Sequence, residues 1–367
     1  MNLFSDYGYN QDEIKARVNS VFKTLFEGAD DERIYFEDKD GGYILDTGNN
    51  DIRSEGMGFG MMIAVQMDRK DIFDKLWSWA KKHHYIDSGE CKGYFHFSCN
   101  TDGSVKMELP RPDGEEFISM ALFFAGHRWG NADGIFNYDA EAKAILDTAL
   151  HSANPLWNKG NFLIRNLIGS DATDIAYNMP HFYEWYSMFD DPKNSDFWKK
   201  AAGASRAFIV RAANKKTGMT AEYTNSQCEP LPENQHGTFF SHSYFAALNI
   251  GLYTLWFGDT PEYATIAKNL IAFFDGKKTD EFMDYKIDGT PGSKKALHPI
   301  GLAAGLGAVS MALERSKEPY EDETMQKARR AVQRFWETPL RKDNRRYYDN
   351  SLYMFALLAL SGQYKVY

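Results

Sequence analysis

Glu55 is the residue in this sequence that is best placed to act as an acid, because it lies at the start of an apolar helix. The next ten residues read Gly-Met-Gly-Phe-Gly-Met-Met-Ile-Ala-Val, and a helix that is apolar on every side belongs in the interior of a large protein. A carboxyl group at the edge of such a helix loses hydration, which disfavours its charged form and can keep a proton near neutral pH. A general acid needs this property. A carboxylate that merely compensates the helix dipole would suit the same position, so both interpretations stay open.

Further polar groups occur at the same place, in the loop or first turn just before another apolar stretch. If consecutive inner helices run parallel, their amino-terminal ends open on one rim and these groups meet in a polar cleft. Each group also has a local explanation as a helix cap, as in the capping-box spacing of residues 113–116. Together they predict a site built from Asp113, Asp174 with Tyr177, His242, His298 and the run Arg345-Arg346-Tyr347-Tyr348-Asp349.

The segments that must position these groups are predicted to be helices of two alternating kinds. One kind has a single apolar face, most clearly in the segment 261–274, where the face consists of Tyr263, Ile266, Ala267, Leu270, Ile271 and Phe274. Helices of this kind are predicted at 10–27, 70–83, 138–151, 195–213, 261–274 and 321–337. The other kind is apolar throughout, although Glu184 interrupts one of them, and is predicted at 55–66, 114–129, 178–190, 241–257, 297–313 and 349–361.

Six apolar helices buried behind six one-faced helices predict an all-α fold, an (α/α)6 barrel of six inner and six outer helices. Few stretches alternate apolar and polar residues over the length of a strand, so the sequence offers little support for a sheet. No linker or change of composition divides the chain, which predicts a single domain over residues 1–367. The stretch 230–237 contains two prolines and a glycine and predicts a loop, a candidate wall of the cleft.

The composition argues against several classes of partner. The formal net charge is −9 and no run rich in Lys or Arg occurs, so nucleic acid is not an expected partner. No apolar stretch is long enough to predict a membrane span, and the first residues do not resemble a secretion signal. The cysteines number three and lack CxxC spacing, which indicates reduced thiols in a cytoplasmic protein. The histidines show no metal-ligand spacing, so no metal or cofactor is expected, and the oligomeric state stays open.

Several carboxylates in a groove rich in aromatic residues suggest glycoside hydrolysis. Aromatic residues make up 15% of the chain, and their flat rings suit the faces of sugars. The leaving oxygen needs a proton from one acid. An inverting enzyme also needs a second group that activates water on the opposite face of the sugar. The rim residues named above could supply both.

Seven motifs spread over nearly the whole chain occur at the spacing of one known family. They are residues 45–49 (LDTGN), 53–57 (RSEGM), 64–73 (AVQMDRKDIF), 112–116 (PDGEE), 180–184 (PHFYE), 297–299 (LHP) and 344–350 (NRRYYDN). On these motifs the sequence resembles glycoside hydrolase family 8, and within it the exo-oligoxylanases that release xylose from reducing ends. The resemblance implies an (α/α)6 barrel that hydrolyses β-1,4-xylo-oligosaccharides with inversion and without a metal. Because related barrels of the family cut β-1,4-glucan and chitosan, another glycanase activity stays open.

The resemblance also implies roles for individual residues. Glu55 would be the general acid, Asp113 would hold the distorted sugar, and Tyr177 would hydrogen-bond the attacking water. His298 would recognise the free anomeric hydroxyl of a terminal xylose from a loop that blocks the aglycone side of the cleft, and that loop would restrict the enzyme to chain ends. The implied substrate-binding residues are Asp113, Tyr177, His298, Arg346 and Tyr347.

The sequence departs from the family pattern at the catalytic base. The family reads Phe-Phe-Ser-Asp-Ser-Tyr before the fourth inner helix, with Asp as the base, whereas residues 239–244 read Phe-Phe-Ser-His-Ser-Tyr. The imidazole of His242 has an ordinary pKa of about 6.5 and can act as a base, but surrounding carboxylates would raise that pKa and leave it protonated. His242 is therefore expected to be a weaker base, with Asp174 as the alternative. Two other outcomes stay open: attack by an anion such as phosphate, which needs no base, and an impaired barrel that only binds oligosaccharides.

Overall fold

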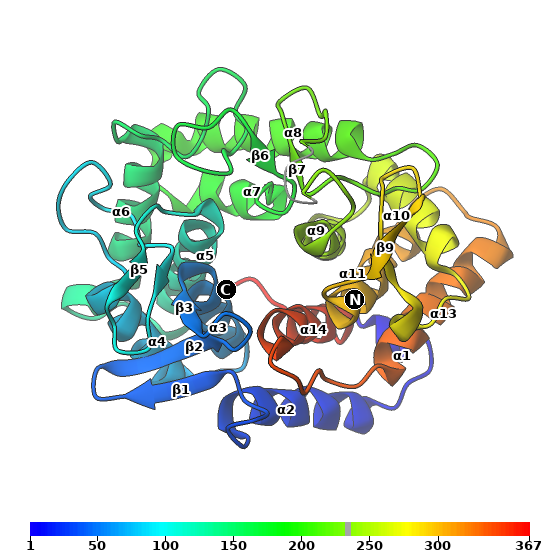
Figure 1. Ribbon diagram of the computed structural model, residues 1–367, viewed down its shortest axis with the longest axis horizontal. Coiled ribbons are helices and arrows are strands. Elements are labelled where there is room, and N and C mark those ends of the chain that lie inside the picture. Colours follow the sequence, from blue (N-terminus) through cyan, green and yellow to red (C-terminus); the bar gives the residue numbers. More distant parts are fainter. Residues whose placement is uncertain (232–235) are drawn as a thin grey trace.

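The computed structural model of the protein describes residues 1–231 and 236–367. Its long helices form two concentric rings around one axis (Figure 1). The inner ring consists of α3 (Ser54–Gln66), α5 (Pro112–Trp129), α7 (Pro180–Phe189), α9 (Ser241–Phe257), α11 (Pro299–Val309) and α14 (Arg346–Leu360). The outer ring consists of α2 (Gln11–Glu27), α4 (Lys70–His83), α6 (Tyr138–His151), α8 (Ser195–Ala212), α10 (Pro261–Phe274) and α13 (Asp322–Glu337). The predicted (α/α)6 barrel is confirmed, with its helices in the predicted order.

A few boundaries differ from the sequence-based prediction. The last inner helix begins at Arg346 rather than 349, and the predicted helix 297–313 divides into α11 and a short α12 (Met311–Glu314). A single helical turn, α1 (Leu3–Asp6), was not predicted, and neither were the 3-10 turns of the described residues, because elements this short show no helical period. The 3-10 turns in residues 1–231 and 236–367 include Gly134–Phe136, Pro192–Asn194 and Thr279–Glu281. Within the predicted loop 230–237, residues 232–235 lie outside the described residues.

The two rings differ in burial as their sequences predict. All residues of α3 and α14 are buried, whereas α13 buries only Ala328, Ala331, Val332 and Phe335. Phenylalanines from four inner helices meet at the axis of the barrel, with ring centroids 4.7 to 5.7 Å apart. They are Phe59, Phe117, Phe245 and Phe355. Because edge-to-face and offset ring pairs of this kind pack tightly, the axis is filled by side chains.

Close packing of the inner helices depends on small residues. A Cβ atom added to Gly58 of α3 would lie 2.5 Å from the Cβ of Phe117 on α5, a distance at which atoms repel. A Cβ on Gly60 would lie 2.6 Å from Cγ1 of Ile44, so this glycine lets α3 pack closely against β2 (Gly41–Asp46). These two glycines therefore allow close packing of α3 against its neighbours.

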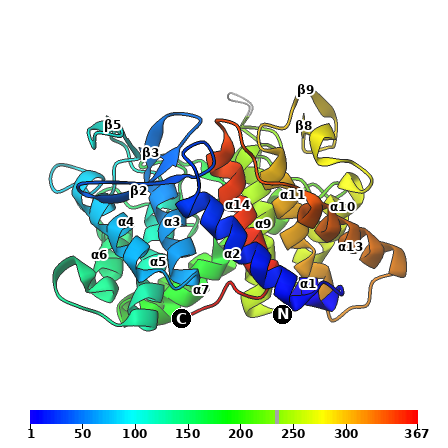
Figure 2. The ribbon, with the colours of Figure 1, turned by 90° about the horizontal axis from the view of Figure 1, so that it is seen from below.

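In the part of the chain that the structure describes, three small antiparallel sheets cover one end of the barrel, although the sequence predicts little sheet. Five strands pair in chain order: β1 (Tyr35–Asp38), β2 (Gly41–Asp46), β3 (Asp51–Arg53), β4 (Ser98–Cys99) and β5 (Val105–Met107). Two further pairs are β6 (Thr173–Asp174) with β7 (Tyr223–Thr224), and β8 (Met283–Tyr285) with β9 (Pro291–Lys295). Figure 2 shows β2, β3 and β5 of the first sheet and the β8–β9 pair at one end of the barrel, and both chain termini at the other end. The sheets thus surround the rim on which the site was predicted.

Two further observations concern the chain as a whole. In residues 1–231 and 236–367, no helix has both the length and the apolar character that a bilayer span requires. Cys91, Cys99 and Cys228 are all free, as the odd count and spacing indicated.

Candidate active site

A polar cavity of about 270 Å³ opens at the rim where the inner helices begin. Residues from four parts of the predicted site line it, so these parts of the chain meet there: Glu55, His242, His298, and Arg345, Tyr347 and Tyr348 of the predicted run. The other lining residues are Asp46, Gly48, Asn49, Arg53, Glu222, His236, Phe240, Ser241 and Leu297. A larger groove between the loop 275–280, the start of α11 and the end of α13 contains none of the predicted site residues. The polar cavity, which lies where the predicted residues meet, is therefore the candidate site.

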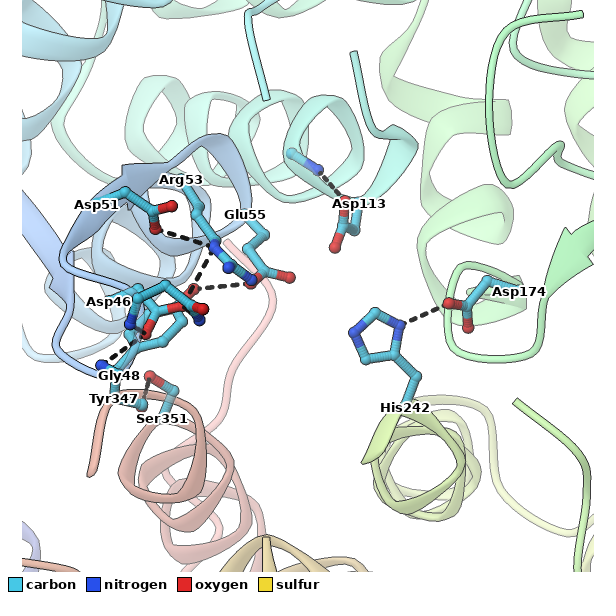
Figure 3. Close-up of polar contacts among 12 residues, drawn as sticks. Asp46, Gly48, Asp51, Arg53, Glu55, Asp113, Asp174, His242, Tyr347 and Ser351 are labelled. Atoms are coloured by element: carbon cyan, nitrogen blue, oxygen red, sulfur yellow. Dashed lines mark hydrogen bonds and ion pairs between the residues drawn. The ribbon is translucent and has the colours of Figure 1, made fainter. Parts of the chain in front are cut away.

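Glu55 is held on one wall of the cavity by the junction between β3 and α3. Its carboxyl group is nearly inaccessible, and the Tyr347 hydroxyl donates a hydrogen bond to its Oε1 over 3.1 Å. Arg53 Nη1 lies 3.8 Å from the same oxygen, while Arg53 Nε lies 3.1 Å from both Asp46 Oδ2 and Asp51 Oδ1 (Figure 3). Two aspartates thus fix the guanidinium beside Glu55. Its positive charge is available to stabilise the carboxylate that remains once Glu55 has donated a proton.

Asp113 lies in the first turn of α5, and Figure 3 shows it beside the space between Glu55 and His242. The side chain is buried. Burial, and next the charge of Glu55, raise the pKa of Asp113 well above its usual range. Asp113 is therefore biased toward its protonated form and can donate a hydrogen bond to a sugar hydroxyl.

The opposite wall is organised around His242, in the first turn of α9. Its Nδ1 lies 2.5 Å from Oδ2 of Asp174, and the other oxygen of Asp174 accepts the N–H of Ala176 over 2.9 Å. Burial disfavours the imidazolium, but the charges of Asp174 and Glu222 outweigh it and raise the pKa of His242 to about 10. The predicted rise in this pKa is confirmed. In Figure 3 the second ring nitrogen points away from Asp174, toward the side of the cavity that holds Glu55.

Sequence reasoning missed a second carboxylate on this wall, Glu222. It comes directly before β7, whose pairing with β6 places Tyr223 opposite Asp174. Glu222 Oε2 lies 2.8 Å from Nδ1 of His236, and Oε1 accepts the backbone N–H of His242 over 3.4 Å. The hydrogen bond to Glu222 raises the pKa of His236. Glu222 precedes a two-residue strand and not an apolar helix, so the pattern of helix starts does not point to it.

The remaining predicted residues fall into two groups. Tyr177 is buried with its ring 5.7 Å from that of His242, and His298 lines the cavity with its Nδ1 3.1 Å from Asp349 Oδ2. Arg346 instead points away. Its guanidinium donates to the backbone oxygens of Arg33 and Asp30, over 3.1 and 2.7 Å. Arg345, which the predicted run also contains, lines the cavity, so the structure does not support Arg346 as the substrate-binding arginine.

Three groups on the His242 wall have the spacing of metal ligands. Asp174, Glu222 and His242 can bring one donor atom each within 4.8 Å of one another. These atoms already bond to one another or to His236, and a metal would have to displace the proton of His242. Hydrogen bonding among the residues themselves accounts for the arrangement.

Comparison with known proteins identifies the family of the chain. Residues 35–362 match the family described as glycosyl hydrolases family 8. The chain therefore belongs to that family and is a glycoside hydrolase.

Among its relatives are two reducing end xylose-releasing exo-oligoxylanases. That of Halalkalibacterium halodurans is 44% identical over 373 residues, which cover 100% of this chain and 94% of the relative. That of Bifidobacterium adolescentis is 40% identical and covers 99% of this chain and 96% of the relative. The structure of an exo-oligoxylanase of Paenibacillus barcinonensis complexed with xylose superposes with a TM-score of 0.95 at 41% identity, covering 100% of this chain and 97% of that one. Endoglucanase A of Acetivibrio thermocellus is more distant, at 26% identity over 86% of this chain and 63% of the relative.

Proposed function

We propose that this glycoside hydrolase releases xylose from the reducing end of β-1,4-xylo-oligosaccharides, with inversion at the anomeric carbon. The proposal rests on the small cavity. The buried Glu55 lies on one of its walls, and His242 and Glu222, which would activate water, lie on the opposite wall. Inverting glycosidases need an acid and a base on opposite faces of the sugar. Xylose is the proposed sugar because the relatives at 40% identity or more that are named above are exo-oligoxylanases.

In the proposed reaction Glu55 gives its proton to the glycosidic oxygen as the bond to the leaving xylose breaks. Tyr347 keeps the carboxyl group oriented, and Arg53 stabilises the carboxylate that is left. Water attacks the anomeric carbon from the opposite face and gives up a proton on the His242 side. Asp113, next to Glu55, hydrogen-bonds the sugar whose bond is cut.

Restriction to reducing ends is assigned to His298. Asp349 Oδ2 holds its Nδ1, and the same oxygen lies 2.5 Å from Nη1 of Arg341, so the ring is fixed in place. His298 lines the cavity, and we propose that its Nε2 bonds the anomeric hydroxyl of the leaving xylose there. A further sugar linked at that hydroxyl would meet the ring.

The expected role of His242 as the base is limited by its protonation. Because the charges of Asp174 and Glu222 raise the pKa of His242 to about 10, the ring is protonated in most molecules at pH 7 and cannot accept a proton from water. Asp174, the alternative base, has no exposed surface, and its oxygens bond to His242 and to the N–H of Ala176. It can take a proton from the cavity only through the ring of His242. Both expected bases are therefore weak.

A second candidate function is phosphorolysis, which the imidazolium of His242 favours because it would attract an anion. Inorganic phosphate in place of water would yield an α-glycosyl phosphate by inversion and would need no base. Against it, Asp174 already balances the charge of His242, and Glu222 lines the same wall. Hydrolysis is therefore the function we propose. A silent oligosaccharide-binding barrel and a glucan-cutting enzyme are the remaining alternatives.

The test is digestion of xylotriose followed by proton NMR during the first turnovers. We expect xylose and α-xylobiose as products, and no cleavage of methyl β-xylotrioside, whose reducing end is blocked. Equal cleavage of the methyl glycoside would contradict the reducing-end requirement. Cleavage of cellotriose in preference to xylotriose would contradict the sugar. A glycosyl phosphate that forms only with added phosphate would favour the second candidate, and binding without any turnover would favour the silent barrel.

A further inference from the structure

Glu222 is the carboxylate beside His242 that the cavity reaches. Asp174 is completely buried and does not line the cavity, whereas Glu222 forms part of its wall. Glu222 Oε1 lies 3.8 Å from Nδ1 of His242 and accepts the backbone N–H of His242 over 3.4 Å. The Glu222 carboxylate is therefore next to the ring of His242, which occupies the position of the family's catalytic base. Both lie on the wall opposite Glu55.

The backbone holds Glu222 rigidly in this place. Its carbonyl oxygen accepts the N–H of Ile175 over 2.9 Å, and its own N–H donates to the carbonyl of Thr238 over 3.0 Å. These bonds fix the residue between the β6 strand and the segment that leads into α9. Oε2 is held by His236, whose ring stacks on Tyr223 at a centroid distance of 4.2 Å. With Oε2 on His236 and Oε1 on the backbone N–H of His242, the carboxylate is fixed, and Oε1 keeps a second lone pair for a water molecule, as preorganised catalysis requires.

We propose that Glu222 is a catalytic residue, the base that accepts a proton from the attacking water in place of the residue at position 242. The proposal rests on the proposed hydrolytic function. The water oxygen bonds to the anomeric carbon, and one water proton passes to Oε1 of Glu222. At the same time the bond to the leaving xylose breaks and its oxygen takes the proton of Glu55. One proton has then entered at Glu222 and one has left Glu55, and exchange with solvent restores both groups.

This assignment gives the neighbouring imidazolium a different role. His242, paired with Asp174, can hydrogen-bond the same water through the ring nitrogen that faces the cavity. A donor at this point orients the water but does not remove its proton. The carboxylate of Glu222 then supplies the basic group that position 242 lacks.

The first test compares Glu222→Gln with the wild type on xylotriose. Removal of a general base should lower kcat by at least about 100-fold, with a much smaller change in KM. Glu229→Gln is the matched control, because Glu229 lies on the same segment, is exposed and bonds to Asn225 at 2.7 Å. We expect the control to keep wild-type turnover, and thermal melts should show that both variants fold.

The second test uses the family's own base to rescue the defect. In His242→Asp/Glu222→Gln a carboxylate returns at position 242, so kcat should recover to within about tenfold of His242→Asp alone. Azide gives a further readout, since this anion attacks without being deprotonated. Added to Glu222→Ala, it should restore cleavage and yield α-xylobiosyl azide.

The outcomes separate this inference from the proposed function. A wild type that does not cleave xylotriose overturns the function itself. A wild type that cleaves xylotriose while Glu222→Gln keeps its kcat within about threefold overturns only the role of Glu222. A large loss that neither the aspartate at position 242 nor azide restores shows that Glu222 merely holds the structure, and also overturns the inference.

Discussion

Exchange of an aspartate for an imidazole at position 242 reverses the charge that this residue contributes to the cavity. The aspartate of the family pattern is an anion that accepts a proton. His242, by contrast, lies 2.5 Å from Asp174 and has a pKa of about 10, so that it is a cation near neutral pH. The cost of burying that cation is offset by its two carboxylate neighbours, Asp174 and Glu222. Chemistry at this wall therefore depends on which carboxylate water can reach.

We expect His242→Asp to raise kcat on xylotriose by at least about tenfold, equivalent to about 1.4 kcal/mol of transition-state stabilisation. The variant restores an anionic base and removes the imidazolium, while the buried Asp174 loses its partner and becomes protonated. The measurement is initial-rate release of reducing sugar, with His242→Asn as a control that changes the charge without adding a base. A kcat for His242→Asp no higher than that of His242→Asn would contradict the prediction.

Glu55→Gln should abolish hydrolysis of unactivated xylosides, with kcat reduced by at least about 100-fold. The amide has the shape of the carboxyl group but no proton to give to the leaving oxygen. Binding of xylotriose, measured by titration calorimetry, should change little because the hydrogen bond with Tyr347 can be kept. Turnover close to that of the wild type would remove Glu55 from its role as the acid.

At the scale of elements, the site depends on how closely the inner helices pack. Gly58→Ala should lower the free energy of unfolding by about 1 to 3 kcal/mol, because its Cβ would lie 2.5 Å from the Cβ of Phe117. The matched control is Gly203→Ala on the outer helix α8, where the nearest atom to a new Cβ is Arg206 Nη2 at 3.9 Å. There alanine should be neutral or stabilise by up to about 1 kcal/mol. Chemical denaturation measures both, and equal effects would contradict the packing argument.

The link between α9 and the β6 strand should be sensitive to pH. The pKa of His242 is about 10 in the folded protein and about 6.5 when unfolded, so the stabilisation that its proton provides is complete below about pH 6.5. It is lost as the pH rises toward 10. The free energy of unfolding of the wild type should fall across this window relative to His242→Asn/Asp174→Asn, in which neither group titrates. Parallel curves for the two proteins would contradict the raised pKa.

For the whole molecule, the barrel could be predicted from the sequence because its pattern is long and consistent. Helices such as α3 and α14 are apolar on all sides, and helices such as α13 have one apolar face, so two rings follow. The sheets could not be predicted, since most of their strands span two to five residues. Even β2, whose residues alternate in burial, is six residues long.

The candidate site was predictable where it coincides with helix starts and less so elsewhere. Glu55 and His242 were found because they precede apolar helices. Glu222 was missed because it precedes a two-residue strand and acquires its place only through strand pairing. Arg345 and Arg346 adjoin in sequence, and the exact start of α14 decides which one faces the cavity. Such details depend on tertiary contacts rather than on local pattern.

The phenylalanines that fill the barrel axis determine how the substrate enters and how the products leave. Phe59, Phe117, Phe245 and Phe355 fill the interior beneath the rim, so the site is open at one end of the barrel and closed at its base. A sugar chain cannot be threaded through it from one end to the other. Both products must leave by the mouth through which the substrate came, so departure of the shortened chain competes directly with arrival of the next one.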